Sequence, residues 1–102
     1  MLRSVGMDRK GRSDLQSTKG DYMPIGTAVR YLKKGEWEKA HAIVQEDESP
    51  LACWAHGIVH MQEGDLSNAR YWYRRAHRKF PESVDMKVEI AALATAVKES
   101  TQ

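Results

Sequence analysis

The stretch GIVHMQEGDLSNARYWYRRAHRKFP, residues 57–81, decides the fold. One helical pattern ends at Gly64, and the side chain of Asp65 is of a type that caps the start of a new helix. Beyond that cap, apolar residues recur at spacings of three and four, at Leu66, Ala69, Tyr73, Ala76 and Phe80. Pro81 should end this helix and begin the next. The stretch therefore predicts a helix, a tight glycine turn and a second helix.

The same pattern occurs earlier in the chain. A shift of 29 residues places Gly35 over Gly64 and Ala40 over Ala69, which predicts two similar helix–turn–helix units. Further helical stripes cover residues 23–35, 37–44 and 51–62, and a last stripe runs from Met86 to Val97, in a helix expected to start at Pro81. No stretch alternates as a strand would. We expect an all-α fold of antiparallel helix pairs, with about five helices and a C-terminal capping helix.

The second unit resembles a tetratricopeptide repeat. Its small, aromatic, small and proline positions from Gly57 to Pro81 match the spacing of that family, and the first unit is a shorter match that keeps Tyr31, Gly35 and Trp37. The chain is also similar to a group of small uncharacterised bacterial and fungal proteins, on the stretches WxxAH at 37–41, WxHxxxH at 54–60 and EGDxxNAxYWYRRA at 63–76. The resemblance implies the fold and a shared polar site, and it implies no function.

Composition limits the chain to one small domain. Among 102 residues, 1–21 carry five basic and three acidic side chains, whereas 22–102 carry eleven of each. We expect residues 1–22 to be a flexible tail and 23–99 a single helical-repeat domain. No apolar run reaches the roughly 18 residues of a membrane helix, and the single cysteine, Cys53, suits a reducing compartment. We therefore expect a cytoplasmic protein without a membrane partner.

Two apolar surfaces indicate partners. In tetratricopeptide arrays the first helix of each pair lines a groove, and the matching positions here would form a peptide-binding groove at Leu51, Trp54, Ile58, Met61 and Gln62. An equally weighted alternative places these side chains in the core. Residues 84–97 hold more apolar side chains than one packed face uses, which predicts a homodimer through this segment, unless the first helices or the tail cover it.

Four polar residues form the expected polar cluster: His41, His56, His60 and Asn68. His56 and His60 are four residues apart on one helix, and Glu63 follows one turn later, a spacing that would suit two or three metal ligands. The favoured interpretation is that these are buried histidines that hydrogen-bond to neighbours such as Asn68, with no metal and no cofactor. Cys53 lies in an apolar context and is expected to be a buried small residue.

A basic surface is expected on the helix after Asp65. Arg70, Arg74 and Arg78 would form one row, with Tyr71, Arg75 and Lys79 beside it. The sequence leaves two interpretations open, namely internal pairing with acids such as Glu48, or binding of an acidic peptide, a phosphate or RNA. No phosphate loop, nucleophile elbow or CxxC motif occurs. We therefore expect a non-catalytic protein or peptide interaction module, ahead of a binder of nucleic acid or another acidic partner and of a metal protein or enzyme using His56, His60 and Glu63.

Overall fold

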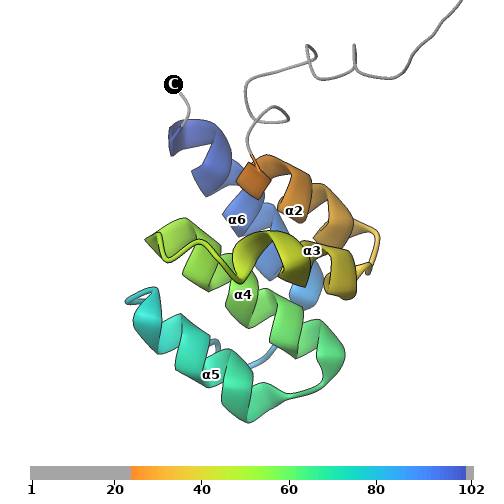
Figure 1. The fold of residues 1–102 in the computed structure, drawn as a ribbon. Coiled ribbons are helices and arrows are strands. Elements are labelled where there is room, and N and C mark those ends of the chain that lie inside the picture. Colours follow the sequence, from red (N-terminus) through yellow and green to blue (C-terminus); the bar gives the residue numbers. More distant parts are fainter. Residues whose placement is uncertain (1–23, 101–102) are drawn as a thin grey trace, which may run out of the picture.

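The computed structural model describes residues 24–100 and is all-helical, as predicted (Figure 1). Five helices make up the described part of the chain: α2 (Pro24–Lys33), α3 (Trp37–Val44), α4 (Pro50–Glu63), α5 (Leu66–Arg75) and α6 (Met86–Ser100). The expected tail at 1–22 lies outside the described residues. None of the helices within 24–100 has the length and apolar character that a membrane span requires.

The turns after α2 and α4 have the same geometry, 29 residues apart. Gly35 and Gly64 both adopt positive φ, at 76° and 96°, where glycine has no Cβ penalty. After each glycine, a backbone N–H returns to a carbonyl five residues earlier: Glu36 donates to Tyr31 and Asp65 donates to His60. These bonds satisfy carbonyls that the helix end leaves free. The two turns reverse the chain and pair α2 with α3 and α4 with α5.

Helix α4 forms the centre of the molecule. Every residue from Ala52 to Met61 is buried, because α4 packs against all four other described helices. Ser49 caps the helix by accepting from the backbone N–H of Ala52, and Pro50 occupies its first turn, where a missing N–H costs nothing. Figure 1 shows α3 in front of α4 and α6 behind it.

Gly57 allows α5 to approach α4 closely. A Cβ atom at this position would lie 2.5 Å from Cδ1 of Tyr73 and 3.2 Å from the carbonyl oxygen of Ala69. Tyr73 is fully buried, and its hydroxyl bonds to Glu89 on α6 and to the indole N–H of Trp54 on α4. One tyrosine therefore links three helices through apolar packing and two polar contacts.

The boundaries of α5 and α6 differ from the prediction. Helix α5 ends at Arg75 rather than at Phe80, because His77 adopts a left-handed conformation with φ of 60° and Arg78 donates back to the carbonyl of Tyr73. Phe80 still reaches the core from a non-helical segment, with its ring 5.1 Å from that of Tyr73, which explains why the apolar pattern continued past the helix end. Helix α6 begins at Met86, not at Pro81, behind an Asp85 side chain that accepts from Val88 N–H.

Candidate metal centre

The predicted groove residues lie in the core. Helix α6 packs against α2 and α4, the two helices expected to line the groove. Trp54, Ile58 and Met61 are at most 3 % exposed. Leu51 is only half-buried, and Gln62 donates to the carbonyl oxygen of Leu32. Of the two interpretations that the sequence left open, the structure therefore supports the core for Trp54, Ile58 and Met61 and not an open groove, with α6 packed against α4 and Arg78 over the ring of Trp54.

The segment expected to form a homodimer is partly covered by the chain itself. Ile90, Leu93 and Val97 are buried against α2 and α4. Val84, Met86 and Val88 are more than a third exposed. Dimerisation through residues 84–97 stays a prediction, and the apolar surface available for it is smaller than the sequence indicated.

The arginines after Asp65 do not form one helical row. Arg70 and Arg75 lie on α5 over aromatic rings, at 4.6 Å from the centroid of Phe80 and 5.1 Å from that of Trp72. Arg78 lies beyond the end of the helix and stacks 3.4 Å from the centroid of Trp54. Arg75 also approaches Glu48 at 3.8 Å and the hydroxyl of Tyr71 at 3.4 Å, whereas Arg74 is exposed. Three of these four guanidinium groups thus have partners within the described residues.

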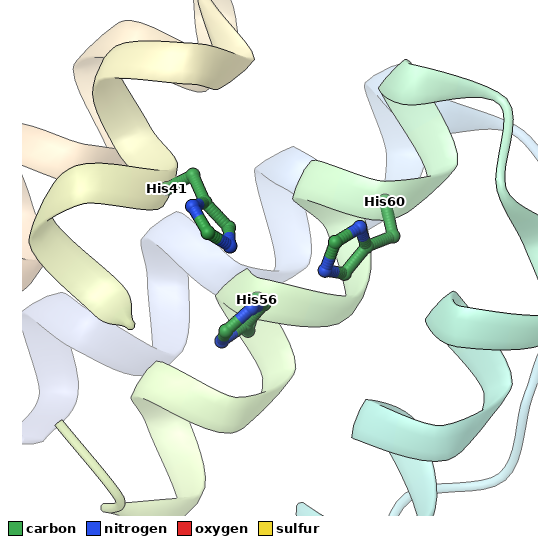
Figure 2. Close-up of side chains that lie close together, drawn as sticks. All are labelled: His41, His56 and His60. Carbon is green, nitrogen blue, oxygen red and sulfur yellow. The ribbon is translucent and has the colours of Figure 1, made fainter. Parts of the chain in front are cut away.

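Three histidines converge between α3 and α4. His41 comes from α3, and His56 and His60 come from successive turns of α4 (Figure 2). The ring centroids are 4.7 Å apart for His41 and His56, 5.0 Å for His56 and His60, and 5.5 Å for His41 and His60. One ring nitrogen from each residue lies within 4.8 Å of the others. His56 and His60 are buried and His41 is half-buried.

Trp72 of α5 holds the ring of His56 in place. The two rings stack face to face, with centroids 3.8 Å apart and planes 7° from parallel. Burial, together with the neighbouring His41 and His60, lowers the pKa of His56 to about 4. His56 is therefore neutral at pH 7, with a ring nitrogen available to donate its lone pair.

Glu63 orients His60. Nδ1 of His60 lies 2.7 Å from the carboxylate of Glu63, one turn further along α4. When Nδ1 carries the proton of this hydrogen bond, Nε2 is left as the free acceptor. Asn68, which was expected to bond to the histidines, contributes only its backbone N–H, to the cap at Asp65. That part of the predicted polar cluster was wrong, because the side chain of Asn68 is not bonded to any of the three rings.

A second group of possible metal ligands contains His60 and two acidic residues. Ligand atoms of His60, Glu63 and Asp65 also lie within 4.8 Å of one another. However, the carboxylate of Asp65 already accepts from Asn68 N–H and from the Ser67 hydroxyl, and Glu63 is bonded to His60. By contrast, the ring nitrogens of His41 and His56 have no hydrogen-bond partner within residues 24–100. The three histidines are therefore the group with donor atoms to spare.

Sequence reasoning identified the three histidines but not the role of Trp72. The sequence places Trp72 three residues after Ala69, and therefore on the side of α5 that faces α4 near Gly57. That spacing was the available indication that an aromatic ring would lie against His56. Comparisons with known proteins gave no matching family model, no matching curated protein and no matching solved structure.

Proposed function

We propose that this protein binds a divalent transition-metal ion, with Zn²⁺ as the reference ion, through His41, His56 and His60. The observation that carries the proposal is the convergence of three imidazoles from two helices, with ligand atoms within 4.8 Å and two of the three rings buried. Imidazole nitrogen is a favoured ligand for Zn²⁺, Cu²⁺, Ni²⁺ and Co²⁺. Metal binding thereby takes precedence over the interaction module that the sequence favoured.

The geometry requires only side-chain adjustment. In a tetrahedral site with Zn–N bonds of about 2.0–2.1 Å, the ligand nitrogens lie about 3.3 Å apart. Closing each nitrogen–nitrogen separation from at most 4.8 Å to this value shortens it by at most about 1.5 Å, which a movement of up to roughly 0.9 Å by each of the three nitrogens would achieve. His41 is half-exposed and has room to turn, whereas the stack on Trp72 fixes the ring of His56.

The surroundings of the rings support the proposal. A carboxylate bonded to the second nitrogen of a ligating histidine fixes its tautomer and raises its basicity, and Glu63 stands in this relation to His60. Three protein nitrogens leave one position of a tetrahedral ion for water or an external ligand, the arrangement of sites that exchange small molecules.

The test is calorimetric titration of the tag-free, chelator-treated full chain with Zn²⁺. We expect one ion per chain and a higher melting temperature in the presence of the ion. His56→Ala and His41→Ala should each weaken binding by more than about a hundredfold, and Glu63→Gln by about ten- to a hundredfold, the usual effect of losing an outer-shell partner. Circular dichroism should show that each variant keeps its helices.

The sequence provides a matched control, because its fourth histidine, His77, is exposed and outside the cluster. His77→Asn removes an imidazole while keeping a residue that tolerates positive φ. It should bind Zn²⁺ as the parent does. Absence of binding, or binding that survives His56→Ala and is lost in His77→Asn, would refute the proposal.

A further inference from the structure

A cleft of about 530 Å³ lies between the α2–α3 turn and the first turn of α6. Gln62 forms part of its wall and is two residues from His60, so the cleft is on the opposite side of α4 from the histidine cluster. Its volume is within the range of small-molecule sites. The cleft is therefore a second candidate site that the metal proposal does not use.

The charges around the cleft have one sign. Lys33, Lys34 and Lys87 line it, and no acidic side chain does so among the described residues. In the part of the chain that the structure describes, none of these three lysines has an ion-pair partner. Like charges gathered on one cleft repel one another, so an anion placed between them would be attracted by all three.

Helix dipoles explain only part of this arrangement. Lys33 and Lys34 lie at the C-terminal end of α2, where cations are favourable. Lys87 lies in the first turn of α6, where a cation is unfavourable and an anion is favoured. The position of Lys87 is thus not accounted for by the stability of its own helix. Asp85 already accepts from the N–H of Val88 at this end and Glu89 lies in the first turn, so the positive charge available to an anion here comes from the three lysines.

The rest of the lining is apolar. The cleft has Trp37, half-buried, on its wall and Leu32 and Ile90 at its base, with Met86, more than a third exposed, at its edge. Such a surface favours the body of a ligand rather than a bare ion. Residues 1–23 do not fit as the occupant on grounds of charge, because they carry five basic and three acidic side chains.

We infer that this cleft binds an amphiphilic organic anion, with a carboxylate or phosphate headgroup at Lys33, Lys34 and Lys87 and an apolar body against Trp37, Leu32 and Ile90. The headgroup is held by the three ammonium groups, and the apolar body displaces water from the aromatic and aliphatic wall. This binding is independent of the metal ion and is tested on chelator-treated protein.

The experiment titrates the full chain with decanoate and with decyl phosphate by calorimetry, and follows amide resonances by NMR. We expect one site per chain, with shifts at Gly35 and Lys87, whereas Gly64, in the equivalent turn of the other unit, stays unchanged. Decanoate should bind more tightly than octanoate, by up to roughly fourfold for each added methylene. The two headgroups distinguish a fatty carboxylate from an alkyl phosphate as the preferred class.

The double variant Lys33→Gln/Lys87→Gln should weaken binding of the preferred probe at least fivefold. Both side chains are exposed, so the fold should tolerate the changes. Lys79→Gln is the matched control, since Lys79 lies outside the cleft and pairs with Glu82 at 4.0 Å. Any of four results would overturn the inference: no binding at millimolar probe, equal binding of neutral decanol, equal binding of inorganic phosphate, or undiminished affinity in the double variant.

Discussion

Substituting alanine for Gly57 sets two effects of opposite sign against each other. Alanine is favoured over glycine in the interior of a helix by about 1 kcal/mol. Against this gain, the new Cβ would lie 2.5 Å from Cδ1 and 2.7 Å from Cε1 of Tyr73, about 1 Å closer than a relaxed carbon–carbon contact. Overpacking of this kind costs about 1–3 kcal/mol or more when the neighbour cannot move.

Tyr73 has little freedom to move. Its side chain is 1 % exposed, its ring packs on Phe80, and its hydroxyl bonds to Trp54 and Glu89. A shift of the ring would break these contacts, so we expect the overlap to outweigh the helix gain. Gly57→Ala should lower the free energy of unfolding by about 1–2 kcal/mol, or the melting temperature by about 4–15 °C for a domain of this size.

Thermal and urea unfolding followed by circular dichroism measure the effect. Ala92→Gly, at an exposed position of α6, is the control for helix propensity alone and should cost about 0.5–1 kcal/mol. In a Tyr73→Val background, where the ring is gone and the carbonyl oxygen of Ala69 at 3.2 Å is the remaining close neighbour, Gly57→Ala should cost less than it does in the parent. If Gly57→Ala melts at or above the parent temperature while Ala92→Gly melts below it, the close packing of α4 on α5 described above is incorrect.

Three further predictions concern the segment after the C-terminal end of α5 and the histidine cluster. His77→Gly should stabilise the fold by about 0.5–1 kcal/mol in thermal melts. The left-handed conformation at φ of 60° costs a residue with a side chain about 1–2 kcal/mol, and the greater conformational entropy that glycine loses on folding offsets part of the gain. An unchanged melting temperature would mean that the turn carries no strain. Arg78→Gln should destabilise the fold by about 0.5–1 kcal/mol, because it removes the stack of the guanidinium group on Trp54. Lys79→Gln is the control and should leave the melting temperature unchanged. Equal melting temperatures for the two variants would mean that the stack does not contribute to stability. In metal-free protein, the lowered pKa of His56, about 4, means that the unfolded state takes up its proton first, so stability is full above about pH 6.5 and falls by up to about 3 kcal/mol towards pH 4. Urea unfolding at several pH values measures this slope, which His56→Gln should reduce.

The sequence predicted the first three helices because residues with fixed backbone preferences mark their ends. Gly35 and Gly64 supply the positive φ of the two turns, and Pro50 begins α4. The end of α5 was wrong because a histidine, which has no such preference, takes the left-handed position, and because Phe80 continues the apolar spacing from outside the helix. Phe80 stands at a spacing that a longer α5 would also produce, so the sequence alone does not distinguish a helical Phe80 from one that reaches the core from a loop.

The open groove is not supported, for a different reason. Its residues were correctly placed on one face of α4, but whether that face is open depends on where α6 packs. That packing brings together Trp54 and Glu89, which are 35 residues apart, with Tyr73 bonded to both, and it has no counterpart in the local periodicity. The histidine cluster was easier to predict, since the spacing of His56 and His60 on one helix is a local property.

Burial of His56 and His60 is itself an argument for the metal centre. Along α4, residues 52–61 are buried, and these two are the polar side chains among them, at 4 % and 8 % exposure. An aliphatic residue at either position would avoid the cost of removing an imidazole from water. Where local choices otherwise agree with the fold, a departure of this kind is expected at a functional site. His41 on α3 adds a third imidazole beside these two buried ones. A bound cation would join α3 to α4 through the three imidazoles, so metal binding and the docking of α3 should be thermodynamically linked.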